Sequence, residues 1–298
     1  MLSPRQWLPG FNATVDYYNI KIKDAIAFPL SGDAIRACFG ADPTHPDPSA
    51  IGSAACAAIH RNASSGGLSG SVASVRGFDS PLTNSGKLAT DGVDFTANYR
   101  HGLGFADLIL NFAGNWTHKA KFWALADSSV PPNCPGLYSA NCGIAIGQLQ
   151  PKWSWNQRTT LSFKPVDVSL LWRHISSFKY QPGLAVLCDT DNPAFDPNDP
   201  TNPNNNPKGC TGNIRNGPFD GTPAQFMSIG QRNYFDLTTR FSITDHFDLT
   251  LAAYNILDKQ PPIVGNNAGT TSANSGNTFP STYDALGRRY SASVRLKF

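Results

Sequence analysis

The sequence lacks any long apolar run. None of its 298 residues belongs to a segment approaching the ~20 consecutive apolar residues that a membrane-spanning helix needs. The first nine residues, MLSPRQWLP, also lack the apolar core of a signal peptide, so either the chain is not exported as written or its start lies upstream. Without a spanning helix, the chain can cross a membrane only as a closed β-barrel, because lipid cannot satisfy exposed backbone groups.

Charge is also scarce. Charged residues make up 15% of the chain, against about 25% in ordinary soluble domains. The net charge is only +3, and no basic run or basic-aromatic platform is present, which argues against a nucleic-acid partner. The mean hydropathy of −0.28 shows that the chain is not simply apolar. Few charges combined with many aromatic and turn residues are typical of a barrel with one lipid face and one wet face.

Catalytic and metal-binding motifs are missing as well. The sequence contains no HExxH, GxSxG, P-loop or GxGxxG pattern. Asp42, Asp47 and Asp79 lack the spacing of a calcium loop and are interpreted as solvated loop charges. We therefore expect neither an enzyme nor a cofactor site. The histidines are scattered: His45, His60, His101, His118, His174 and His246.

The cysteines are few but clustered. Six cysteines allow 15 pairings, and their local grouping favours three disulfides over scattered free thiols. Zinc binding is the other alternative, but no CxxC pair or nearby histidine pattern supports it. Disulfides indicate an oxidising compartment. The expected pairs are Cys38 with Cys56, Cys134 with Cys142, and Cys188 with Cys210.

Strict alternation of apolar and polar residues predicts long β-strands. The last strand places Tyr290, Val294, Leu296 and Phe298 on one face, and its aromatic end is typical of the signal that the outer-membrane barrel assembly machinery reads. Its other face carries serine, arginine and lysine. About eight strands are predicted, at residues 11–23, 86–100, 105–117, 152–163, 166–177, 231–243, 247–257 and 286–298.

The predicted connections alternate in length. Tight turns are expected at 101–104, 164–165 and 244–246, and long loops at 24–85, 118–151, 178–230 and 258–285. All six cysteines fall in the long loops, where short helices are expected at 33–39 and 53–61. Short periplasmic turns with long extracellular loops are the outer-membrane pattern, so we expect an all-β, antiparallel transmembrane barrel portion.

Two sets of side chains are candidate functional groups. Trp116, Trp153, Trp155 and Trp172 lie near the loop ends of their strands and are predicted to form an aromatic girdle, with a soluble tryptophan core as the alternative. The polar strand faces carry charges that would face the barrel lumen. We favour a structural charge ladder for them over substrate contact, and hypothesise that Arg158 and Arg173 touch an anionic substrate. The set is Arg158, Arg173, Arg240, Arg289, Arg295, Asp94, Asp167, Asp236 and Asp248.

Several motifs resemble the C-terminal barrel of TonB-dependent receptors. They are VDYYNIKIKD at 15–24, GVDF at 92–95, AYNILDK at 253–259 and the segment from Thr282 to Phe298. The resemblance implies a barrel of roughly 22 strands with an N-terminal plug, which takes up siderophores, cobalamin or saccharides. It covers nearly the whole chain, residues 1–298, as roughly the last eight strands, with neither plug nor earlier strands.

The resemblance also implies location and partners. We expect a Gram-negative outer membrane with the loops extracellular, contacts with lipid and the assembly machinery, and coupling to the TonB complex only through a plug. A segment of this kind would leave two strand edges, near Phe11 and Phe298, and would be inactive alone. The alternatives are a self-contained eight-stranded outer-membrane barrel with a structural or adhesive role, and a secreted disulfide-bonded β domain that binds carbohydrate.

Overall fold

The computed structural model describes residues 6–27, 38, 52–64, 71, 73, 75, 77–79, 82–123, 133–139, 142, 148–181, 186–187, 214–215, 228–264 and 278–297. By internal contacts the chain divides into two units. The first comprises Met1–Tyr18, Gly92–His118 and Cys134–Phe298, and the second comprises Asn19–Asp91 and Lys119–Asn133. Among the described residues, no helix combines the length and the apolar character needed to cross a membrane.

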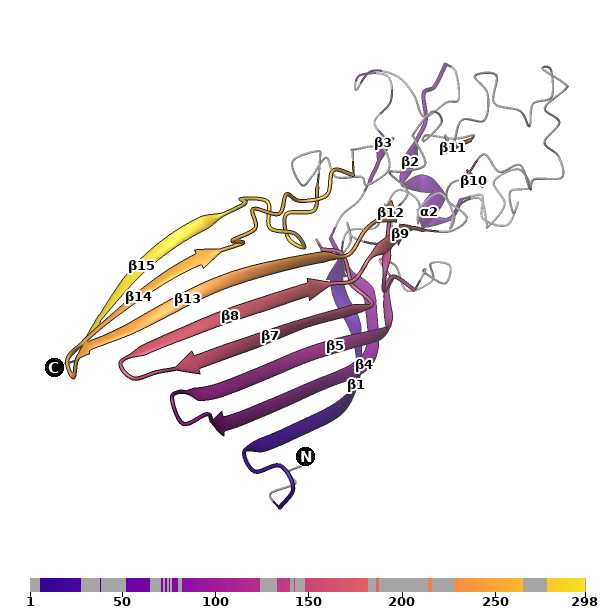
Figure 1. The fold of residues 1–298 in the computed structure, drawn as a ribbon. Helices are drawn as coiled ribbons and strands as arrows, with labels where there is room; N and C mark the ends of the chain where they lie inside the picture. The colour runs from indigo at the N-terminus through magenta and orange to yellow at the C-terminus, as the bar shows by residue number, and fades with distance from the viewer. Residues whose placement is uncertain are drawn as a thin grey trace, which may run out of the picture. The chain divides into compact units, whose positions relative to one another are not determined.

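An eight-stranded antiparallel sheet dominates the chain, in the order β1-β4-β5-β7-β8-β13-β14-β15. Each strand lies beside the next long strand in sequence, and Figure 1 shows β7, β8, β13, β14 and β15 side by side. This confirms the predicted all-β, antiparallel class. In the described part of the chain, β1 and β15 are the two edges of the order. The strands are β1 Phe11–Ala27, β4 Thr83–Gly102, β5 Asp107–Trp123, β7 Trp153–Ser162, β8 Val166–Ile175, β13 Arg232–Thr244, β14 Phe247–Tyr254 and β15 Arg289–Leu296.

The register keeps the two predicted faces separate across five strand pairings. One row runs Leu110, Thr159, Leu170, Leu237, Ala253 and Tyr290, and it belongs to what we call the apolar face. The row beside it contains Asn111, Arg158, Leu171 and Asp236, and belongs to the polar face. The apolar face is uncovered: Leu251 is 44% exposed and Val294 is 56% exposed. Such a continuous uncovered apolar surface is unusual for a soluble protein.

The strand ends differ from the predictions: β1, β4 and β5 are longer than predicted, whereas β14 is shorter and β15 begins at Arg289, three residues late. β5 continues to Trp123 and β4 begins at Thr83, because residues 118–123 contain no turn-forming residue and continue to pair. The Thr90 hydroxyl donates to the Lys119 carbonyl at 3.0 Å, and Lys119 pairs with Asp91 at 2.7 Å. β14 instead stops at Tyr254, three residues early, because Asn255 adopts a left-handed φ of 49°. The long strands therefore shorten two of the predicted loops.

The helix predicted at 53–61 is largely wrong. Only Ala54–Ala57 is helical (α2), and Ile59–His60 forms β2, which pairs with β3 at Gly77–Phe78. The predicted Cys38–Cys56 disulfide is present, with a Cα–Cα distance of 4.7 Å, and links α2 covalently to Cys38. The helix predicted at 33–39 lies outside the described residues apart from Cys38. A further short pair joins β10 Val186–Leu187 to β11 Ile214–Arg215.

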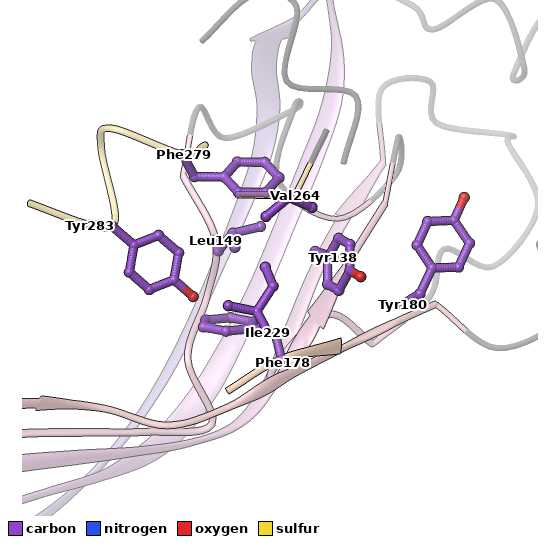
Figure 2. Packing of buried hydrophobic residues seen from close by; sticks show 8 residues of the cluster. All are labelled: Tyr138, Leu149, Phe178, Tyr180, Ile229, Val264, Phe279 and Tyr283. Atoms are coloured by element: carbon purple, nitrogen blue, oxygen red, sulfur yellow. The ribbon is translucent and has the colours of Figure 1, made fainter. Parts of the chain in front are cut away.

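Beyond the strand ends, segments from several predicted loops form a hydrophobic cluster that we call the loop core. Three short strands frame it: β6 Leu137–Tyr138, β9 Phe178–Tyr180 and β12 Ser228–Ile229, in the order β12-β9-β6. No member is more than 6% exposed, and Figure 2 shows Leu149, Val264 and Ile229 among the aromatic rings. The members are Tyr138, Leu149, Phe178, Tyr180, Ile229, Val264, Phe279 and Tyr283.

Covalent and polar contacts support the loop core. The Cys134–Cys142 disulfide confirms the second predicted pair, whereas Cys188 and Cys210 lie outside the described residues. The Leu149 N–H donates to the Thr282 hydroxyl at 3.0 Å, which joins segments 133 residues apart. Burial raises the pKa of Tyr180 to about 12, so this hydroxyl stays neutral at physiological pH.

Gly92, part of the GVDF segment, sits where β4 passes close to β5. A Cβ at this buried position would lie 2.3 Å from the Trp116 carbonyl oxygen and 2.5 Å from the Tyr18 hydroxyl. We predict that Gly92→Ala lowers the free energy of unfolding by roughly 1–3 kcal/mol, as overpacking does. The measurement is urea unfolding of the chain in detergent micelles.

Gly102→Ala is the matched control for this prediction. It lies in the same strand, and its Cβ would meet nothing closer than the Asp107 carboxylate at 3.6 Å. Alanine in a strand normally gains about 0.5–1 kcal/mol over glycine through reduced chain entropy. A Gly92→Ala variant as stable as Gly102→Ala would refute the steric account.

Candidate functional site

An ion network lies on the polar face near the loop ends of β8 and β13. Arg173 Nε and Nη2 donate to the two carboxylate oxygens of Asp236, at 2.9 and 3.1 Å. The Arg173 guanidinium also lies 3.6 Å from Asp284 and 5.1 Å from the ring centroid of Tyr234. The two carboxylates are almost completely buried, at 8% and 4% side-chain exposure. The charge of Arg173 is therefore compensated by two protein carboxylates.

Asp284 links this network to the loop core. Its carboxylate accepts from Arg289 at 3.1 Å, and its backbone N–H donates to the Tyr234 hydroxyl at 3.3 Å. Its neighbour Tyr283 belongs to the loop core. Sequence reasoning missed Asp284 because it lies in a predicted loop, outside any alternating strand pattern. The signal that pointed to it was its position in the segment 282–298 that carries the family resemblance.

Asn255 gives the AYNILDK segment at residues 253–259 a structural role in the turn after β14. Its side chain accepts from the Lys259 N–H at 2.9 Å and donates to the Lys259 carbonyl at 3.0 Å, which closes the turn after β14. Its own backbone N–H donates to Asp236 at 2.8 Å. Asparagine tolerates the left-handed conformation found here better than most residues. The turn therefore helps to fix the carboxylate that holds Arg173.

The other predicted lumen charges share the polar face, and all but Arg158 and Arg295 have a polar partner among the described residues. Arg240 pairs with Asp167 on the neighbouring strand. Asp248 lies opposite Arg295 in the register, yet its carboxylate contacts Lys297 at 3.1 Å. Asp94 accepts from the Asn115 amide at 2.7 Å. Most of the set thus forms a ladder of cross-strand partners.

Arg158 differs from these residues. It lies in the middle of β7, with Asn111 opposite on β5 and Leu171 opposite on β8. In the described part of the chain, its guanidinium makes no ion pair or hydrogen bond; besides the backbone pairing of the sheet, its carbonyl accepts from the Gln157 side chain at 3.1 Å. It lines a hollow of about 440 Å³ on the polar face. The lining is Thr96, Asn98, Asn111, Phe112, Ala113, Asn156, Arg158, Leu171 and Arg173.

The four predicted girdle tryptophans lie on the apolar face and touch one another in pairs. Ring centroids are 5.9 Å apart for Trp116 and Trp153, and 4.4 Å apart for Trp155 and Trp172. The Trp172 indole N–H donates to Asn233 at 2.9 Å, so its polar atom is satisfied within the protein. Trp153 is 44% exposed, which contradicts a buried tryptophan core at this position.

The remaining predicted positions are also placed. Tyr290, Val294 and Leu296 lie in β15 on the apolar face and are exposed, whereas Phe298 is outside the described residues. Among the residues that the structure describes, no group of three His, Cys, Asp or Glu side chains could hold a metal ion.

Comparisons with known proteins concern both sequence and fold. The profile described as "TonB dependent receptor-like, beta-barrel" matches residues 5–256. A search of curated proteins found no significant match. Of the solved structures, a ferric enterobactin receptor mutant from Pseudomonas aeruginosa in complex with enterobactin is similar, with 12% identity and a TM-score of 0.50 over 97% of this chain and 29% of that chain.

Two further solved structures are similar at lower scores. The FrpB iron transporter from Neisseria meningitidis has 14% identity and a TM-score of 0.45, covering 97% of this chain and 29% of that one. The siderophore receptor PirA from Acinetobacter baumannii has 11% identity and a TM-score of 0.42, covering 97% and 30%. This chain thus spans less than a third of the length of these receptors. Because the family profile covers most of its residues, the chain belongs to the TonB-dependent receptor-like β-barrel family.

Proposed function

We propose that this chain forms the C-terminal part of an outer-membrane receptor barrel that takes up a scarce nutrient. The observation that carries the proposal is the uncovered apolar face of an eight-stranded antiparallel sheet, backed by a polar face of paired charges. Lipid would cover the first face and the lumen would border the second. Such a barrel is a transport component and not an enzyme.

The substrate class is a siderophore, cobalamin or saccharide. The similar ferric enterobactin receptor supports the siderophore class. The protein would lie in the outer membrane of a Gram-negative bacterium with its long loops outside. Its partners would be outer-membrane lipid, the barrel assembly machinery acting on β15, and the TonB complex acting through a plug. The aromatic pairs near the loop ends support a girdle at the membrane surface.

The location is tested by expressing the chain behind a signal peptide, fractionating the cells, and running the outer membrane on a gel with and without heating. A heat-modifiable band would show that these strands close by themselves, and would favour the self-contained barrel. Aggregated material would show that assembly needs further strands, as expected for part of a larger receptor. A chain that stays monomeric in solution without detergent would contradict an outer-membrane role.

The face assignment predicts a difference between neighbouring residues in β13. Leu237 points to the apolar face and Thr238 to the polar face. Leu237→Arg should lower the stability of the folded chain in lipid vesicles by roughly 2–4 kcal/mol, because it exposes a charge to hydrocarbon. Thr238→Arg is the matched control and should change stability far less. Equal effects in a vesicle refolding titration would reject the lipid-facing assignment.

The two carboxylates that hold Arg173 predict a structural role for it. Arg173→Gln should lower the free energy of unfolding by roughly 1–3 kcal/mol. This is less than the cost of breaking a fully buried ion pair, because the Arg173 side chain is 31% exposed and Asp284 would still be paired with Arg289. The test is urea unfolding of the variant beside Arg240→Gln, whose partner Asp167 is more exposed, at 21%. Substrate contact by Arg173 would be supported instead if stability stayed unchanged while nutrient uptake by a receptor carrying the variant fell.

A further inference from the structure

The arginines of the polar face are not equivalent. Arg100, Arg173, Arg240 and Arg289 each hold a carboxylate at 3.1 Å or less. In the described part of the chain, Arg158, Arg232 and Arg295 hold none. Arg232 donates to backbone carbonyls at the start of β13 and Arg295 lies in the edge strand β15, whereas Arg158 lies between two paired strands. An arginine keeps its positive charge at any physiological pH, so this position carries an uncompensated cation.

The hollow beside Arg158 contains no carboxylate that could compensate this charge. Its other cation, Arg173, is neutralised by Asp236 and Asp284. One acidic residue, Asp94, lines the adjoining hollow; its carboxylate accepts from the Asn115 amide and, in the described part of the chain, forms no ion pair with Arg158. A single net positive charge therefore faces a space of about 440 Å³, which is within the range of roughly 300–1,000 Å³ typical of small-molecule sites.

Amide side chains surround the free guanidinium. Asn111 lies directly opposite Arg158, at the ~5 Å spacing of cross-strand neighbours. Asn156 lies two residues along β7 on the same face, and Asn98 receives a hydrogen bond from the Asn111 amide at 2.8 Å. Each of these amides has a second N–H or a carbonyl left for a ligand. The hollow thus offers one unpaired guanidinium group and several neutral amide groups as hydrogen-bonding partners.

We propose that Arg158, with Asn98, Asn111 and Asn156, binds an oxyanion group of a small solute. Guanidinium groups bind carboxylate and phosphate through paired, charge-assisted hydrogen bonds, and the amides would orient the polar remainder of the solute. The inference rests on the proposed function, since a solute reaches the polar face only if that face lines the route of uptake. The proposal assigns recognition of the solute to Arg158, whereas the role predicted for Arg173 is structural.

The test uses the full chain folded in neutral detergent micelles, with calorimetric titration of citrate, inorganic phosphate and maltose. Citrate or phosphate should bind, and sodium chloride should weaken the binding. Arg158→Gln should reduce the affinity at least roughly tenfold, as expected for loss of a charge-assisted hydrogen bond. Arg158→Lys keeps the positive charge but loses the planar guanidinium that can bind an oxyanion through two hydrogen bonds. Its affinity should lie between those of the unaltered chain and Arg158→Gln. Preference for citrate would identify a carboxylate site, and preference for phosphate a phosphate site.

Arg240→Gln is the matched control, because Arg240 shares the polar face but is paired with Asp167. It should leave the affinity unchanged. The proposal is overturned if neither anion binds, if Arg158→Gln binds as the unaltered chain does, or if Arg240→Gln weakens binding equally. Circular dichroism checks the fold, and if Arg158→Gln does not fold, Arg158→Lys and Asn111→Leu carry the same test. Because micelles replace the membrane, failure here is distinguishable from failure to reach the outer membrane.

Discussion

Continuous backbone pairing across eight antiparallel strands is the constraint on which the rest of this protein depends. Each inner strand satisfies its N–H and C=O groups on both neighbours, so the sheet needs no helix layer to cover its backbone. The same pairing fixes the register, and register fixes which side chains share a face. A slip of one residue between β13 and β14 would carry Leu237 to the polar face and Asp236 to the apolar face. The chemical separation of the two faces is thus a consequence of hydrogen-bond geometry.

Electrostatics on the polar face follows from that separation. Charges that alternate with apolar residues along each strand come into line with charges on the next strand, and most of them pair. The partners that hold Arg173 come from β13 and from the segment before β15, so the network joins strands to loops. Arg158 is left outside this ladder, with amides in place of acids around it. Arginines of one face therefore differ in whether a carboxylate compensates their charge.

The loop core places a soluble-type interior beside a sheet with an exposed apolar face. Its side chains are almost fully buried, whereas Leu251 on the apolar face is 44% exposed. Apolar side chains are thus found in two environments within one chain: packed against one another in the loop core, and exposed along the apolar face of the sheet. The Cys134–Cys142 disulfide and the turn around Asn255 stand at the boundary between the two regions. This boundary is also where Tyr283 and Asp284 connect the loop core to the ion network.

Local pattern alone was enough to predict the eight strands, their two faces and the two described disulfides, because a period of two and short cysteine spacings are properties of adjacent residues. It also placed Arg158 and Arg173 on one face, but it could not tell which of them is ion-paired. The partners of Arg173 are Asp236 and Asp284, which lie 63 and 111 residues further along the chain. The loop core was missed for the same reason: its members come from five separate segments without any periodicity. Strand formation and facing were determined by the sequence itself, through side-chain alternation. Which charges are neutralised was decided only by tertiary structure, because it depends on distances between atoms far apart in the chain.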